Sequence, residues 1–260
     1  DRYLFRVWIE RFPRCNAVIP YLRRYPLGSS VEGELEKLRN ESQNNPNRRR
    51  QLTAVQFYLQ SALWEAEYNW KREVAQGVTN YKTLLDQIEM WRREAKEKVC
   101  LVTFNYDTLL EDALSAVGVN IRKLADYIGS DDYKIIKLHG SINWAHTVDV
   151  SIEDTSIRPR LNIVNELIEK STELQIKSDY HMISVALGDP AAMSALKPEF
   201  PIIPALAIPV ENKQEYQCPQ DHSDVLLNCI PEVTKIILIG WRVTERNFVK
   251  LLTDNLHREL

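Results

Sequence analysis

The chain has 260 residues, of which 44% are hydrophobic and 27% are charged, and its formal net charge is −3. This composition is typical of a globular protein with a sizeable core, in one large domain or two smaller ones. The slightly acidic balance gives no general attraction to nucleic acid or to anionic membranes, and no apolar run approaches the roughly 20 residues that span a bilayer. The four cysteines form no Cys-x-x-Cys pair, so we expect no structural zinc and a reducing, cytoplasmic setting.

Residues 1–98 are predicted to be mostly helical. Apolar residues recur at helical spacing in 51–68 and in 81–96, and another helix is expected to begin at Ser30. Residues 40–50 are polar and contain a proline, which is typical of a surface loop. The three consecutive arginines at the end of this loop could contact nucleic acid, but such a run is more often the solvated start of a helix.

The pattern changes to strand, turn and helix at Val99. The apolar, β-branched run 99–104 predicts a buried strand. The capping-box pattern Thr108-x-x-Glu111 predicts that a helix starts directly afterwards, and Gly118 is a suitable left-handed end for that helix.

Three polar or amphipathic residues, Asn105, Tyr106 and Asp107, lie between this strand and this helix. In open α/β sheets, ligands bind at the carboxyl ends of the strands, and a helix N-terminus favours negative charge such as phosphate. The plainer alternative is that Asn105 and Asp107 only cap the helix, which is the commonest role of these residue types.

Further strands are predicted in the rest of the chain. Apolar runs place a short one at 121–124 and longer ones at 133–138 and 235–239, of which the last is the clearest in the sequence. The segment 201–209 is apolar but rich in proline, so we expect an edge strand or an extended lining segment there. Helices are predicted at 161–168, at 221–230 and from about residue 244 to the end.

The strands predicted at 133–138 and 235–239 end in polar or small residues, like the strand before Asn105. The first leads to His139-Gly140-Ser141 and the second to Gly240-Trp241-Arg242. If the three strands are parallel neighbours, their carboxyl ends bring these residues to one crevice.

The chemistry that these residues permit is restricted. The sequence has neither the Gly-x-Ser-x-Gly of a nucleophile elbow nor the Gly-x-x-x-x-Gly-Lys-Ser/Thr of a P-loop. His139 is the natural general base because the pKa of histidine lies near neutral pH, Asn105 could hold a hydroxyl or a water, and Arg242 could pair with phosphate. Considered alone, a histidine before a glycine, such as His139, is more often a turn residue than a catalytic one. A tryptophan such as Trp241 is more often part of the core than a ligand contact.

Three motifs occur in this order along the chain: Thr103–Glu111 (TFNYDTLLE), Lys137–Trp144 (KLHGSINW) and Ile239–Arg242 (IGWR). Together they resemble the sirtuin-like domains of bacterial antiphage defence proteins. The resemblance implies an α/β fold with a Rossmann-like three-layer parallel sheet that binds NAD. Residues 1–260 are then expected to form a single domain, with a mostly helical portion at 1–98 and the Rossmann-like core at 99–260.

The defence members of this family hydrolyse NAD to ADP-ribose and nicotinamide, which depletes the infected cell of NAD. The resemblance implies that Asn105 holds the ribose or the attacking water, that His139 is the general base, and that Asp107 lies near the nicotinamide amide. Residues expected to contact the dinucleotide are Thr103, Tyr106, Gly140, Ser141, Gly240, Trp241 and Arg242. We further expect a homo-oligomer or a complex with a defence partner such as an ATPase or a nucleic-acid sensor, without direct nucleic-acid or membrane contact.

Two departures from the family pattern bear on function. The chain cannot build the four-cysteine zinc module of deacetylase sirtuins, so we expect no metal and favour hydrolysis over lysine deacylation. The family's first strand and Gly-rich phosphate loop are also missing, because none of the eight glycines forms a Gly-x-Gly. We expect either that this loop lies upstream in the natural protein or that the chain is a non-catalytic NAD- or ADP-ribose-binding sensor or a scaffold; a protein deacylase is a distant alternative.

Overall fold

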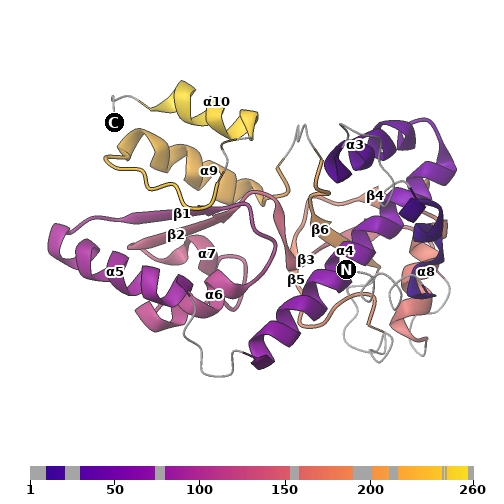
Figure 1. Cartoon of the computed structure of the whole chain (residues 1–260), viewed down its shortest axis with the longest axis horizontal. Helices are drawn as coiled ribbons and strands as arrows, with labels where there is room; N and C mark the ends of the chain where they lie inside the picture. The colour runs from indigo at the N-terminus through magenta and orange to yellow at the C-terminus, as the bar shows by residue number, and fades with distance from the viewer. Residues whose placement is uncertain are drawn as a thin grey trace.

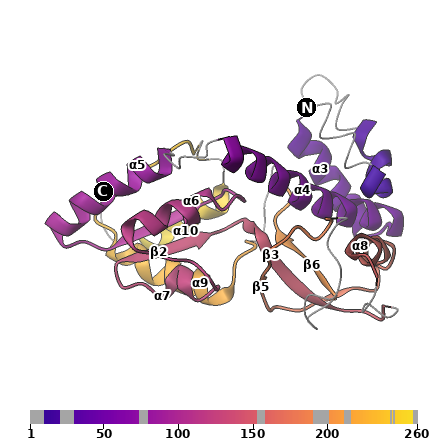
Figure 2. The same ribbon diagram turned by 90° about the horizontal axis from the view of Figure 1, so that it is seen from below.

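The computed structural model describes residues 10–20, 30–73, 80–152, 158–189, 201–210, 216–241, 243 and 245–256. In Figure 1 the described chain forms two lobes that lie side by side, each built around its own small sheet. Figure 2 shows the same two lobes from below.

The sheet of the first lobe has two parallel strands, β1 (Val99–Thr103) and β2 (Tyr133–Lys137). Val99 pairs with Tyr133 and Thr103 pairs with Lys137, so both strands end at the same edge of the sheet. Parallel pairing requires a crossover connection, and here it contains α6 (Leu109–Leu114), the 3-10 helix η2 (Ser115–Val117) and α7 (Asp126–Gly129). The two predicted strands are therefore confirmed, whereas the short strand predicted at 121–124 is wrong, because these residues form bends and turns of the connection.

Different helices cover the two faces of β1 and β2, because successive side chains of a strand point to opposite faces. Leu101 and Ile135 belong to a core with α5 (Asn80–Ala95), α6 and α7. Val102 and Ile136 belong to a core with α9 (Gln220–Cys229), the 3-10 helix η3 (Ile230–Glu232) and α10 (Arg246–Asn255), and Figure 1 shows these two sets of helices on opposite sides of the strands. This mixed α/β arrangement with a small parallel sheet is compatible with the Rossmann-like fold that we expected, and the three-layer sheet stays a prediction.

The strand β3 (Gly140–Asp149) leads from the first lobe into the second. It pairs antiparallel with β4 (Gln175–Ile176), β5 (His181–Met182) and β6 (Ile202–Leu206). A separate buried core joins this sheet to η1 (Pro13–Ala17), α3 (Val31–Ser42), α4 (Pro46–Glu73) and α8 (Arg160–Glu169). The helices of 31–73 therefore pack on the second lobe and α5 packs on the first, and the division at residue 98 stays a prediction.

Most predicted helices are confirmed. The segments 51–68 and 81–96 correspond to α4 and α5. The surface loop predicted at 40–50 is wrong except for residues 43–45, because α3 extends to Ser42 and the three arginines lie in the first turns of α4. Gly118 ends the helical segment after β1 with a φ of 82°, the left-handed conformation that glycine adopts without steric cost. The proline-rich segment 201–209 contains β6, which is buried along its whole length.

The strand predicted at 235–239 is wrong. These residues belong to no strand, and the side chains of Ile237, Leu238 and Ile239 are 74%, 57% and 62% exposed. A strand forms where its backbone N–H and C=O groups find partners, and within the described sheets β1 pairs with β2 alone. The apolar pattern is typical of a strand, but no strand in the described residues pairs with this segment.

The residues that follow β2 form a tight connection to β3. Leu138 and His139 make a turn, and β3 begins at Gly140. Gly140 has a φ of 77°, and a methyl group on it would lie 2.1 Å from the carbonyl oxygen of Ala205 on β6. Only glycine lets the chain turn here and approach β6 so closely.

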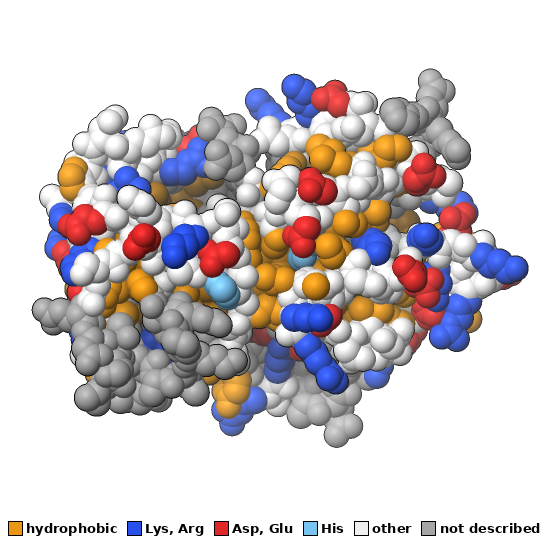
Figure 3. Space-filling model, turned by 180° about the vertical axis from the view of Figure 1, so that it is seen from behind, with side chains coloured by type: hydrophobic (Ala, Val, Ile, Leu, Met, Phe, Trp, Pro, Cys, Tyr) orange, Lys and Arg blue, Asp and Glu red, His pale blue; other side chains and the backbone are white. Residues whose placement is uncertain are grey.

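Charged side chains of both signs are mixed across the face of the molecule seen in Figure 3. This distribution agrees with the small net charge of −3. Among the helices that the structure describes, none combines the length and the apolar character needed to cross a membrane.

We expect Gly140→Ala to lower the free energy of unfolding by about 3 kcal/mol, because it adds a steric clash to a strained φ. Gly118→Ala is the matched control, since Gly118 has a similar φ of 82° but no described residue other than its chain neighbours lies within 4 Å of an added methyl group. It should cost only about 1 kcal/mol. Urea denaturation of both variants measures the difference, and equal losses would contradict the role of the β3–β6 contact.

The pH dependence of stability should contain a contribution from Glu89 of α5. Its side chain is 11% exposed, and hydrogen bonds from Arg92, Tyr133 and Arg93 lower its pKa to about 2 against the cost of burial. A lowered pKa in the folded state stabilises the protein above the unfolded pKa, and the gain is lost as the pH falls toward 2. Glu89→Gln should therefore cost about 2–3 kcal/mol at pH 7 and almost nothing near pH 2.

Glu94→Gln, an exposed position on the same helix, is the control for this measurement. Denaturant midpoints between pH 2 and pH 7 would show the two curves. A constant gap between the wild-type protein and Glu89→Gln across this range would mean that the carboxylate of Glu89 is not the stabilising group.

Candidate functional site

The residues that follow β1 and β2 are in direct contact. The Nδ1 atom of His139 lies 3.2 Å from the carbonyl oxygen of Phe104. The hydroxyl of Ser141 donates to the carbonyl oxygen of Tyr106 at 3.2 Å, and the rings of Tyr106 and His139 have centroids 6.1 Å apart. The first two motifs therefore converge, because parallel strands in register bring their carboxyl ends to one edge.

His139 is held in one orientation by these contacts, and it is 2% exposed. A carbonyl oxygen can only accept a hydrogen bond, so the contact with Phe104 requires the imidazole proton on Nδ1. In the neutral ring, Nε2 is then the nitrogen that can take up a proton, as a general base does.

An aromatic group surrounds Phe104 at the end of β1. Its ring centroid lies 5.0 Å from that of His139, 5.4 Å from that of Trp241 and 5.3 Å from that of Phe248. The indole Nε1 of Trp241 donates to the carboxylate of Glu245. Trp241 thus packs on Phe104, which follows β1, although the residues before Trp241 form no strand.

The rest of the third motif is placed differently from the first two. Gly240 is exposed, with a φ of 65°, and among the described residues beyond its two chain neighbours no atom lies within 4 Å of the position that a Cβ would take. Arg242 lies outside the described residues. The structure therefore brings Trp241 to the first motif, through Phe104, and shows no contact of Gly240 with the described residues of either motif.

Asn105 is exposed at this edge of the sheet, in contrast to the buried His139. Its side-chain Nδ2 donates to the hydroxyl oxygen of Tyr81 on α5 at 2.8 Å, and its backbone N–H donates to Oγ1 of Thr103 at 3.1 Å. Burial and the negative charge of Asp107 raise the pKa of Tyr81. Sequence reasoning missed Tyr81, because it matches the apolar helical pattern of α5 and nothing else distinguishes it.

The capping box predicted at the start of α6 is not formed. Thr108 instead uses its hydroxyl and its backbone N–H to contact the carboxylate of Glu67 on α4, at 2.6 and 2.7 Å. Asp107 accepts a hydrogen bond from the backbone N–H of Leu109 at 3.1 Å, so the capping role considered for Asp107 is the one its geometry shows. The side chain of Glu111 points into the protein, because it pairs with a buried lysine.

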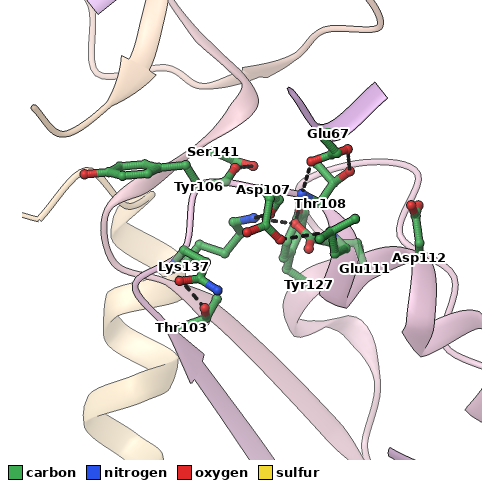
Figure 4. A network of polar contacts seen from close by, with 12 residues as sticks. Glu67, Thr103, Tyr106, Asp107, Thr108, Glu111, Asp112, Tyr127, Lys137 and Ser141 are labelled. Carbon is green, nitrogen blue, oxygen red and sulfur yellow. Dashed lines mark hydrogen bonds and ion pairs between the residues drawn. The ribbon is translucent and has the colours of Figure 1, made fainter. Parts of the chain in front are cut away.

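That lysine is Lys137, the last residue of β2, which is 0% exposed. Its Nζ donates to Oε1 of Glu111 at 2.8 Å and to the backbone carbonyl of Asp107, as Figure 4 shows. Tyr127 donates to the same carboxylate oxygen at 2.9 Å. A buried ion pair therefore holds the loop of Asn105 and Asp107 against the end of β2.

Two buried hydroxyl groups near the strand ends have no hydrogen-bond partner within the described parts of the chain, those of Tyr106 and Tyr216. In Figure 4 the ring of Tyr106 points away from the ion pair of Lys137 and Glu111. Burial, with a smaller effect from the charge of Glu245, raises the pKa of Tyr106 and raises that of Tyr216 to about 12. Buried hydroxyls are normally hydrogen-bonded, so both are suited to contact polar groups of a ligand. No group of three or more potential metal ligands occurs among the residues that could be searched.

We expect Lys137→Met to lower the free energy of unfolding by about 3–5 kcal/mol, because it leaves the carboxylate of Glu111 buried without a cation. The double variant Lys137→Met/Glu111→Leu should recover most of this loss. Lys134→Met on the same strand is the control, since the hydrogen bonds of Lys134 to described residues go to backbone carbonyls, those of Ile128 and Ser130. Equal losses in the two single variants, measured by urea denaturation, would contradict the importance of the ion pair.

Residues 99–185 match the family model of the SIR2-like domain. The matched region contains β1, β2 and β3, and thus both motifs that converge at the strand ends, but not Trp241. No curated protein and no solved structure matches the chain. SIR2-like domains use NAD, and their family is one of NAD-dependent enzymes. The match supports a sirtuin-like domain in this part of the chain.

Proposed function

We propose that this chain hydrolyses NAD to ADP-ribose and nicotinamide, as an effector of antiphage defence. One observation carries the proposal: within the region that matches the SIR2-like domain, His139 meets the residues that follow β1. The position of His139 beside the carbonyl oxygen of Phe104 supports a role as general base. The exposure of Asn105 at the same edge supports a role in holding the ribose or the attacking water.

The proposed reaction breaks the bond between C1′ of the ribose and the nicotinamide nitrogen, through an oxocarbenium-like transition state. Water adds to C1′, and Nε2 of His139 takes a proton from that water or from a ribose hydroxyl. Nicotinamide leaves as a neutral ring from a cationic one, so its departure requires no proton. The site can therefore work without the acidic carboxyl group that glycosidases use on sugar leaving groups.

Polar groups near His139 suit the remainder of the dinucleotide. The hydroxyls of Tyr106 and Tyr216 can donate to ribose or phosphate oxygens. Thr103, Ser141 and the backbone at Gly140 are further candidates. We propose Asp107 near the nicotinamide amide and Arg242 near a phosphate.

Regulation is part of the proposal, because a continuously active enzyme of this kind would deplete the NAD of its own cell. We propose that oligomerisation or a defence partner, such as an ATPase or a nucleic-acid sensor, controls the activity. The exposed apolar residues at 236–239 are compatible with contacts beyond the described chain.

A non-catalytic module that binds NAD or ADP-ribose is the second candidate. The absence of Gly-x-Gly from the sequence favours it, because glycine-rich loops commonly hold the pyrophosphate of a dinucleotide. Such a module would bind NAD through the same strand ends and release no nicotinamide.

The decisive measurement is nicotinamide release from NAD by the full-length protein, with and without its partner proteins, followed by chromatography. Under activating conditions, His139→Ala and Asn105→Ala should each lower turnover by about 100-fold or more. His181→Ala on β5 and Asn120→Ala on an exposed loop are matched controls that should retain turnover. NAD that stays intact under every condition, while calorimetry shows that it binds, would favour the second candidate.

A further inference from the structure

The side chain of Asn105 makes a hydrogen bond to α5 that none of the roles proposed above uses. Its Nδ2 donates to the hydroxyl oxygen of Tyr81 at 2.8 Å. Asn105 is exposed, whereas Tyr81 is partly buried. An exposed amide that has no protein partner exchanges hydrogen bonds with water in several orientations, so this contact determines how the amide of Asn105 lies.

The main chain on both sides of Asn105 is fixed by other contacts. The backbone N–H of Asn105 donates to Oγ1 of Thr103 at 3.1 Å, and the carboxylate of Asp107 accepts from the backbone N–H of Leu109 at 3.1 Å. These two hydrogen bonds hold the backbone of the loop but leave the side chain of Asn105 free to rotate. Among the described residues, Tyr81 alone hydrogen-bonds to the amide, so it is the residue that sets the amide's direction.

Tyr81 is itself held by the core of the first lobe. Its ring packs against the buried residues that α5, α6 and α7 contribute to that core. The position of the hydroxyl is therefore determined by rigid elements before any ligand arrives. Burial, followed by the negative charge of Asp107, raises the pKa of Tyr81, so the hydroxyl stays neutral at physiological pH.

The direction of this hydrogen bond decides which end of the amide remains for a ligand. A side-chain amide has a donor group, NH2, and an acceptor, the carbonyl oxygen, on opposite sides. Because Tyr81 engages the donor group, Oδ1 of Asn105 lies on the side of the amide that faces away from the tyrosine hydroxyl. A carbonyl oxygen accepts a hydrogen bond from an O–H group, which both water and a ribose hydroxyl have.

We propose that Tyr81 is a positioning residue, which directs the carbonyl oxygen of Asn105 toward the ribose hydroxyl or the attacking water at the strand ends. This inference rests on the proposed function, because that function assigns the ribose or the water to Asn105. Without the hydroxyl of Tyr81 the amide rotates, and a reacting group that is held less precisely reacts more slowly.

The first test is the turnover of NAD by the full-length protein under activating conditions. Tyr81→Phe keeps the ring in the core and removes the hydroxyl, so it should lower kcat about tenfold. It should change KM for NAD by less than about twofold, because the amide is still present and the other contacts of NAD are unchanged. Tyr68→Phe is the matched control, since Tyr68 is a tyrosine of α4 that is 57% exposed, and it should retain the wild-type values.

A double-mutant cycle separates positioning from a structural role. In an Asn105→Ala background there is no amide to direct, so Tyr81→Phe should lower turnover no further. If Tyr81 only stabilised the fold, its replacement would lower turnover by the same factor in both backgrounds. That result would overturn the proposal, as would wild-type turnover in Tyr81→Phe itself.

The contact can also be measured without NAD, by heteronuclear NMR of the side-chain amide of Asn105. The resonances are assigned by their disappearance in Asn105→Ala. Tyr81→Phe should shift them and Tyr68→Phe should not, because only the former removes the acceptor of the amide proton. Unshifted resonances in Tyr81→Phe would overturn the proposal whether or not the protein hydrolyses NAD.

A wild-type protein that binds NAD but releases no nicotinamide would contradict the proposed function and leave the role of Tyr81 open to the same cycle. The cycle is then measured as Kd for NAD by calorimetry. Tyr81→Phe should weaken binding about fivefold in the wild-type background and should have no effect in Asn105→Ala. Equal weakening in both backgrounds, or no weakening in either, would overturn the proposal.

Discussion

The parallel register of β1 and β2 is the constraint on which the candidate site depends. Because Thr103 pairs with Lys137, both strands end at the same edge, and the carbonyl of Phe104 meets the imidazole of His139 there. A slip of β2 by one residue would turn each of its side chains to the opposite face. The ammonium of Lys137 would then leave the carboxylate of Glu111, whose burial makes an unpaired charge costly. The ion pair and the register therefore support each other.

The same edge of the sheet is where the two lobes meet. Glu67 of α4, which packs on the second lobe, binds the hydroxyl and the backbone N–H of Thr108 at the start of α6. β3 crosses from the first lobe to the second immediately after His139. Three side chains thus hold the loop of Asn105: Lys137 at the end of β2, Glu67 on α4 and Tyr81 on α5. Residues on rigid elements of both lobes define its position, which a ligand-binding loop requires.

Among the described strands, β1 pairs with β2 alone, so no described strand lies along its other edge. β1 is half-buried along its whole length, whereas four of the five residues of β2 are buried. The segment 235–239 has the composition of a buried strand and yet lies exposed. The composition of a segment indicates whether its side chains suit a sheet. The backbone hydrogen bonds of a strand also require a neighbouring strand at a distance of about 4.8 Å. For this segment, no such neighbour occurs among the described residues.

The sequence by itself determined the local features whose causes are local. The helical periodicity of 81–96, the β-branched run 99–104 and the left-handed position at Gly118 depend on nearby residues, and each was predicted correctly. Convergence of the Asn105 and His139 motifs was also predictable, because parallel strands share an edge. Only the tertiary structure decided that Thr108 binds Glu67 instead of capping its helix, that Glu111 pairs with Lys137, and that 235–239 forms no strand. Each of these outcomes depends on a partner distant in sequence, and the pattern of neighbouring residues contains no information about that partner.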